Sequence, residues 1–254
     1  MIGFGPAVVS RAVGNVRQAC AVLIMVSGSV VLAASASAET VEVYPSTKVT
    51  KHTYDAPLNE QPFYGFMPKS DAMLAADRKF IEAVEKNTGR EVGADEFQAM
   101  GWNAVQGGDF TTAAKRFNQA WLLAPGRSVP VHGLAVVAAA RFGDLDFAIE
   151  LASVAAGLRN PLPALSGDQG GLLIKAGKPG QAIPYLEKAA ATLPDWVNPQ
   201  INLALARFDT GDVRETCRLL GKVEQMLKDR PGARSTTIDN NVRTLTEKAQ
   251  CGSL

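Results

Sequence analysis

The segment FQAMGWNAVQGGDFTTAAKRFNQAWLLAP, residues 97–125, contains the pattern from which the fold of this chain can be predicted. One helical segment runs to Val105, Gly107-Gly108-Asp109 forms a turn, and a second helical segment runs from Phe110 until Pro125 ends it. Glycine and proline at these places are typical of a helix–turn–helix unit. Such a unit cannot bury its apolar face alone, so similar units are expected to stack on it.

The turn glycine recurs at a nearly constant period, at Gly108, Gly143, Gly177 and Gly211. Small residues recur in the second segments at Ala113, Ala148, Ala182 and Thr216, and in the first segments at Gly101, Val136, Gly170 and Ala204. Val136 departs from this pattern, and Gly133 or Ala135 is expected to take its place. The pattern resembles the tetratricopeptide repeat. The resemblance implies an all-α solenoid of about four repeats, at residues 94–127, 128–162, 163–196 and 197–230.

Both ends of the stack are predicted to carry an extra helix. Ser70 is a plausible N-cap for an opening helix within residues 70–93, and residues 231–254 are expected to form a capping helix and a tail. The capping helix has a polar outer face, which the last unit of a solenoid needs because its apolar face would otherwise meet water.

Residues 1–38 have the order of a secretory signal peptide. Arg11 and Arg17 precede an apolar run, and the small residues Ala36-Ser37-Ala38 follow it. Cleavage is predicted after Ala38, and the location is predicted to be periplasmic or secreted. The alternative is an uncleaved membrane anchor, although the apolar run is short for a spanning helix.

Residues 39–69 are predicted to form an extended arm rich in proline and aromatic residues. Four prolines in this segment, at positions 45, 57, 62 and 68, are expected to prevent a regular helix and to break strand pairing. Two hypotheses remain open. Either Phe63 to Phe66 pack on the first helices while the rest is mobile, or the arm lies in a groove of its own chain or of a partner.

Cys217 and Cys251 are the cysteines outside the predicted signal peptide, and they are symmetric about position 234. If the last repeat and the capping helix form a hairpin, the two residues lie opposite each other on its two helices. A disulfide is therefore predicted in an oxidising compartment, with a stabilisation of roughly 2–4 kcal/mol. The alternative is two independent thiols, with Cys217 buried and Cys251 exposed.

The chain contains no recognisable catalytic or cofactor motif. His52 and His132 are its only histidines, and no His/Cys cluster has metal-ligand spacing. Ser166-Gly167-Asp168 is interpreted as an N-cap and first-turn charge. No cofactor is predicted. The formal net charge of +1 does not indicate a basic surface that would bind nucleic acid. No membrane association is expected after signal cleavage.

The resemblance implies that the first helix of each repeat lines a concave inner face where a partner would bind. The inward residues on this register are Gln98, Trp102, Gln106, Val137, Arg141, Ile174, Lys175, Leu205 and Phe208. Arg141 and Lys175 hold equivalent positions in adjacent repeats. Their side chains are expected to project in parallel and to bind a peptide carboxylate or an acidic side chain. The alternative is that Trp102 packs on the opening helix and that the two cations are solvated.

These observations favour a non-enzymatic scaffold of the bacterial cell envelope that binds a protein or an extended peptide. One alternative is an assembly or secretion chaperone for an envelope component. Another is a cell-wall or glycan hydrolase, which would need a pair of acids or a nucleophile–base set that the sequence does not show.

Overall fold

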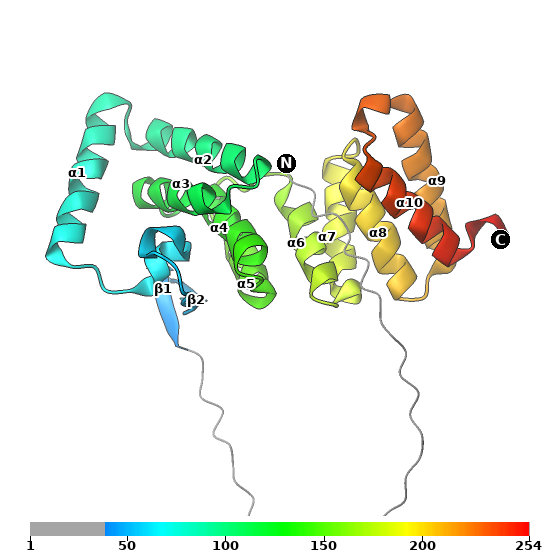
Figure 1. The fold of residues 1–254 in the computed structure, drawn as a ribbon, viewed down its shortest axis with the longest axis horizontal. Helices are drawn as coiled ribbons and strands as arrows, with labels where there is room; N and C mark the ends of the chain where they lie inside the picture. The colour runs from blue at the N-terminus through cyan, green and yellow to red at the C-terminus, as the bar shows by residue number, and fades with distance from the viewer. Residues whose placement is uncertain (1–38, 254) are drawn as a thin grey trace, which may run out of the picture.

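The computed structural model describes residues 39–253 and shows a stack of helix pairs preceded by a short β-hairpin (Figure 1). The predicted signal peptide and its cleavage site lie outside these residues. The four pairs are α2 (Arg90–Gln106) with α3 (Phe110–Leu123), α4 (Ser128–Arg141) with α5 (Leu145–Gly157), α6 (Leu165–Lys175) with α7 (Pro179–Thr192), and α8 (Val197–Asp209) with α9 (Val213–Asp229). The predicted all-α solenoid of four helix–turn–helix units is confirmed.

The turn inside each pair follows from its glycine. Gly108, Gly143, Gly177 and Gly211 have φ values of +75°, +68°, +70° and +88°. This left-handed backbone is strained for residues with a Cβ atom, which explains why glycine recurs at the repeat period. Aspartate follows the glycine in the first, second and fourth turns. Its carboxylate caps the next helix by accepting a hydrogen bond from a backbone N–H, as Asp109 does from Thr112.

Phe117 of α3 explains the small residues of the first two pairs. Its ring is fully buried. A Cβ atom added at Gly101 of α2 would lie 2.6 Å from this ring, and one added at Gly133 of α4 would lie 2.4 Å from it. The ring therefore fills the space between two helices that lack side chains there. In the second pair, Gly133 and not Val136 is therefore the small residue at which α4 approaches the Phe117 ring closely.

The arm contains regular structure that the sequence did not predict. Strands β1 (Thr40–Tyr44) and β2 (Thr47–Thr50) pair antiparallel, so the expectation that prolines break strand pairing is wrong for this part. The reason is position, because Pro45 lies in the turn between the strands and the other prolines follow β2. Two 3-10 turns, η1 (Leu58–Glu60) and η2 (Pro62–Phe66), complete the arm.

Each end of the stack is closed by one further helix. Helix α1 (Asp71–Asn87) packs Phe80, Ile81 and Val84 against a small cluster around Leu123. Helix α2 begins at Arg90, before the predicted repeat start at residue 94. At the other end α10 (Thr236–Ala249) follows η3 (Pro231–Ala233), buries Val242 and Leu245, and leads into η4 (Cys251–Ser253).

The buried apolar residues of the stack form two main clusters that meet within α6. The first extends from Val43 of the arm to Leu172, and the second from Leu173 to Leu245. Among residues 39–253, no helix has both the length and the apolar character needed to cross a bilayer.

Candidate functional site

Two of the predicted inward residues cannot contact a partner. Gln98 is 5% exposed, and its Nε2 donates to the carbonyl of Ala94 on the same helix at 2.9 Å. Val137 is fully buried in the first cluster, because α4 is covered on nearly every side. The prediction that these two side chains line an open groove is wrong. A repeat register identifies helix faces, but it does not show what other segments cover them.

The remaining predicted residues differ in their accessibility. Trp102 is partly buried, with its ring edge-on to Phe117 of α3 at 5.3 Å and to His132 of α4 at 5.0 Å between centroids. Partly buried apolar side chains also occur at Ile174, Leu205 and Phe208. Gln106 and Lys175 are exposed at the ends of their helices. Partial desolvation lowers the pKa of Lys175 from its ordinary value.

Arg141 does not project into an empty groove beside Lys175. Its Nη2 donates to Glu60 of the arm at 2.5 Å, and Lys115 of α3 lies 3.0 Å from the other oxygen of the same carboxylate. Hydrogen bonds from Arg141 and then from Lys115 hold the pKa of Glu60 below its ordinary value. Arg141 therefore forms its ion pair with a carboxylate of the arm, within the same chain.

The arm lies along α3 and α5, and we call the surface that it covers the arm site. This surface is formed mainly by Asn118, Trp121, Phe147 and Glu150. Asn118 is fully buried. Its side chain accepts a hydrogen bond from Phe63 N at 3.0 Å and donates to the carbonyls of Gln61 at 2.7 Å and Asn59 at 3.2 Å. One amide thus forms hydrogen bonds with three backbone groups of the arm, including the N–H of the buried Phe63.

Aromatic contacts hold the arm along the rest of the arm site. Phe63 packs edge-on against Trp121, with ring centroids 5.3 Å apart, and Phe66 packs against Phe147 at 6.1 Å. At the other side of the arm, Thr50 N donates to Glu150 Oε1 at 2.7 Å. The arm site therefore combines hydrogen bonds to the backbone with contacts between aromatic rings, both of which proteins use to bind peptide segments.

Asp144 connects the turn of the second pair to the arm. One of its oxygens caps α5, and the other accepts from Tyr54 Oη at 2.9 Å and contacts His52 Nδ1 at 2.7 Å. Burial and the neighbouring carboxylate raise the pKa of the Tyr54 hydroxyl far above its ordinary value. Tyr54 therefore stays protonated and donates to Asp144. Together with Asn118, these contacts support the hypothesis that the arm lies in a groove of its own chain.

The second histidine is also paired with a carboxylate. His132 Nε2 lies 2.9 Å from Asp168 Oδ2, and the two residues are 1% and 5% exposed. Asp168 is a first-turn residue of α6, as predicted, but the N-cap is Ala164 and has no side-chain bond. The pair links α4 to α6 in the interior. Among residues 39–253, no group of three His, Cys, Asp or Glu residues is arranged to hold a metal ion.

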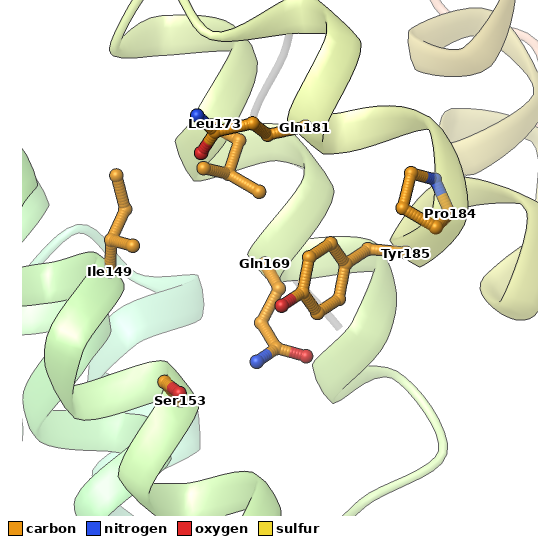
Figure 2. Close-up of a pocket in the computed structure, with 7 residues that line it drawn as sticks. All are labelled: Ile149, Ser153, Gln169, Leu173, Gln181, Pro184 and Tyr185. Carbon is orange, nitrogen blue, oxygen red and sulfur yellow. The ribbon is translucent and has the colours of Figure 1, made fainter.

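A second concave feature lies one repeat further along the stack. A cavity of about 390 Å³ opens between α5, α6 and α7, and we call it the α5–α7 pocket (Figure 2). Its walls are formed by seven residues, Ile149, Ser153, Gln169, Leu173, Gln181, Pro184 and Tyr185. Figure 2 shows the Gln169 amide lying between Ser153 and Tyr185. No sequence pattern indicates this pocket, because its walls come from helices of two different repeats.

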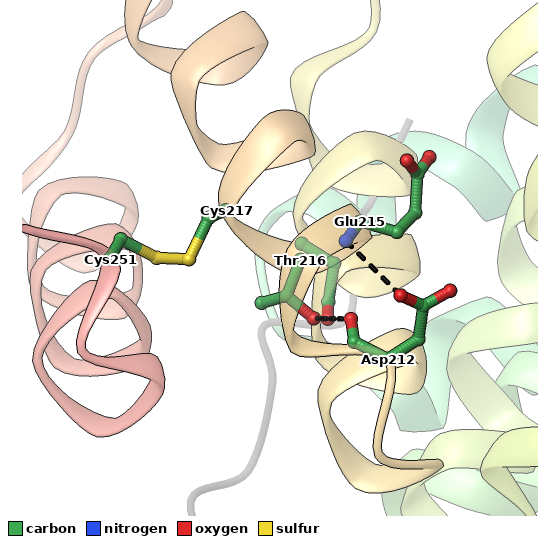
Figure 3. Close-up of a disulfide and its surroundings, with 6 residues drawn as sticks. Asp212, Glu215, Thr216, Cys217 and Cys251 are labelled. Atoms are coloured by element: carbon green, nitrogen blue, oxygen red, sulfur yellow. Dashed lines mark hydrogen bonds between the residues drawn. A yellow bond between two sulfur atoms is a disulfide. The ribbon is translucent and has the colours of Figure 1, made fainter. Parts of the chain in front are cut away.

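The structure joins Cys217 of α9 to Cys251, just after α10, by a disulfide with a Cα–Cα distance of 5.3 Å (Figure 3). This is the pairing expected from the symmetry of the terminal hairpin. Neighbouring Thr216 is fully buried and donates to the carbonyl of Asp212 at 2.8 Å. The disulfide therefore ties the terminal cap to the well-packed beginning of α9.

The sequence matches no protein-family model and no curated protein. Solved structures of similar shape do exist. PilF of Pseudomonas aeruginosa superposes with a TM-score of 0.54 at 18% identity, covering 64% of this chain and 72% of PilF. YrrB, described as a TPR protein with an unusual peptide-binding site, gives 0.50 at 16% identity over 69% of this chain and 86% of YrrB. A thermophilic TPR protein of Thermus thermophilus gives 0.50 at 16% identity, covering 67% of this chain and 89% of the thermophilic one.

Proposed function

We propose that this chain, which has the tetratricopeptide-repeat fold, is a non-enzymatic scaffold of the bacterial cell envelope that binds a protein or an extended peptide. The fold by itself does not fix a function. The observation that carries the proposal is the arm site, where Asn118 and two aromatic side chains hold a non-helical segment along the helices. The surface of this stack is therefore chemically suited to binding an irregular polypeptide segment. YrrB, a protein of similar fold, is described as having a peptide-binding site.

The envelope location is supported by the disulfide between Cys217 and Cys251. Disulfides of this kind form and persist mainly in oxidising compartments, including the bacterial periplasm. The basic, apolar and small-residue order of residues 1–38 points to export as well. The two features are independent, because one is a covalent bond at the C-terminal end and the other is a sequence pattern at the N-terminal end.

The two histidine–carboxylate pairs are better explained as structural contacts than as catalytic dyads. His52 and Asp144 anchor the arm, and Asp144 also caps α5. His132 and Asp168 are almost completely buried, so a substrate has no access to them. A general base must reach the proton that it removes. These contacts favour a binding protein over a hydrolase.

We place the partner on the ends of the first helices, where Gln106 and Lys175 are exposed. The test is to introduce a photo-crosslinking residue at Gln106 in cells that export the chain, with Lys222, exposed on α9, as the control position. A crosslinked protein in the envelope fraction is expected from position 106 and not from position 222. The absence of any crosslink from position 106 would count against this placement.

Lys175→Glu is the charge test of this surface, and Lys175→Gln is its neutral counterpart. Arg141 is not used for this test, because Arg141→Glu would release Glu60 and loosen the arm, so its effect on binding would be ambiguous. We expect Lys175→Glu to weaken capture at position 106 more than Lys175→Gln does, because only the first variant places a negative charge at the surface. Unchanged capture would remove Lys175 from the proposed surface.

A further inference from the structure

We propose that the α5–α7 pocket is a second peptide site, which binds an uncharged, extended segment carrying an aromatic side chain from a partner protein. The inference rests on the proposed function, because it specifies where and what a peptide-binding scaffold of this fold would bind. Two sites of this chain, the arm site and the α5–α7 pocket, hold equivalent places in successive repeats. The arm site lies between α3 and α5, and the pocket lies between α5 and α7, one repeat further along the stack.

Three of the four residues that form the arm site have a counterpart one repeat later that lines the pocket, and the fourth, Trp121, corresponds to Ala156, which does not. Asn118, which recognises the backbone of the arm, is replaced one repeat later by Ser153 on α5. Phe147 and Glu150, which contact the arm from α5, are replaced on α7 by Gln181 and Pro184. All three replacement residues line the pocket. The stack therefore repeats the same concave feature, filled by the arm at one position and open at the next.

The pocket offers the groups that an extended peptide needs. Ile149, Leu173 and Pro184 give it apolar walls, and Tyr185 is a large aromatic residue that remains 37% exposed. The amide of Gln169 is held in place because its Nε2 donates to the carbonyl of Ala152 at 3.2 Å. Its oxygen and the Ser153 hydroxyl can then accept hydrogen bonds from the peptide backbone. A ring packed on Tyr185 would extend the aromatic contacts seen in the arm site.

The charges of the two sites differ, and this difference defines the ligand. The arm site uses Arg141 and Lys115 to hold Glu60. None of the seven residues that line the α5–α7 pocket is charged. An acidic or basic segment would lose hydration there without gaining an ion pair with a wall residue, whereas a neutral aromatic segment would lose little. The α5–α7 pocket is therefore selective for neutral segments.

The test uses the full, disulfide-bonded chain and a synthetic peptide, QPFYGFM, which copies residues 61–67 and carries no charged side chain. One form of the peptide carries a fluorophore for anisotropy titration, and another carries benzoylphenylalanine in place of its first phenylalanine. Ser153→Trp blocks the pocket from an exposed position, and Ser153→Ala is the matched control. Tyr185→Glu is a second blocking variant, which places a charge at the exposed rim.

We expect saturable binding, with crosslinks to α5 and α7. Ser153→Trp and Tyr185→Glu should each weaken binding about tenfold or more, and Ser153→Ala by less than about threefold. A peptide with alanine at both phenylalanines should also bind about tenfold more weakly. Crosslinks confined to α3, equal binding by all the variants, or no saturable binding would each overturn the inference.

The same variants separate this inference from the proposed function. If Ser153→Trp fails to bind the peptide but still gives the crosslinked protein at position 106, the pocket is a separate peptide site on a working scaffold. If the peptide does not bind to the wild-type chain while position 106 still captures a protein, the pocket inference fails and the scaffold function stands. If position 106 captures nothing while the peptide binds in the pocket, the first-helix surface is wrong and the pocket inference stands.

Discussion

The two halves of the stack differ in what covers the outer surface of their helices. In the first half, the arm covers α3 and α5 and contributes Val43, Val49 and Phe63 to the core. In the second half, no such segment covers the α5–α7 pocket among the described residues, and the terminal helix is held by a disulfide. A repeated surface therefore becomes either part of the core or an open pocket, depending on whether another part of the chain covers it.

The largest expected effect comes from removing the arm. Deleting residues 39–69 should destabilise the first half by on the order of 5 kcal/mol, because it removes Phe63 and the two buried valines from the core and exposes the apolar helix surface that they cover. Hydrogen exchange should show faster exchange in α3, α4 and α5 and little change in α8 and α9. Equal loss of protection in both halves would show that the stack unfolds as one unit.

Breaking the disulfide should destabilise the second half of the stack. Cys251→Ser opens a loop that spans 34 residues of sequence and should cost about 2–4 kcal/mol, lowering the thermal midpoint by roughly 5–15 °C. Exchange should increase in α10 first. Wild-type protein treated with a reductant is the control and should behave like the variant. If α3 loses protection as much as α10 does, the proposed separation of the halves is incorrect.

A single methyl group tests the packing of the first half. Gly133→Ala places a Cβ 2.4 Å from the Phe117 ring and should destabilise by about 1–3 kcal/mol, because both partners are buried. Gly157→Ala, on the neighbouring helix, is the matched control, since nothing lies within 4 Å of its Cβ. Chemical denaturation of both variants measures the difference. Equal midpoints would indicate that Phe117 moves aside freely.

The smallest expected effect concerns pH and the arm. Because the pKa of Glu60 is lowered in the folded chain, its stabilising contribution is complete above the ordinary glutamate pKa, near 4.5, and is lost as the pH falls through the lowered value. Limited proteolysis of the arm should therefore speed up at acidic pH. Glu60→Gln should remove much of this acid-dependent change. An identical pH dependence in wild type and variant would assign the effect to other groups.

The sequence predicted the parts of this protein that local chemistry controls. Turn glycines and small residues at the repeat period act within a few residues, so four helix pairs could be placed from the sequence, and the structure adds that the aspartate after three of these glycines caps the next helix. The disulfide was also predictable, because its geometry follows from a hairpin of neighbouring helices. Only the repeat irregularity at Val136 needed the structure to resolve it.

The binding surfaces were decided by tertiary contacts. Asn118 meets Phe63 across 55 residues and Thr50 meets Glu150 across 100 residues, so no local pattern shows which helix face the arm covers. Gln98 and Val137 were mistaken for groove residues because the repeat register assigns a helix face but not its burial, and both side chains are buried in the folded chain. The α5–α7 pocket exists because the arm ends one repeat before it. Periodicity determined the stack, and packing between distant segments decided which of its repeated surfaces stayed open.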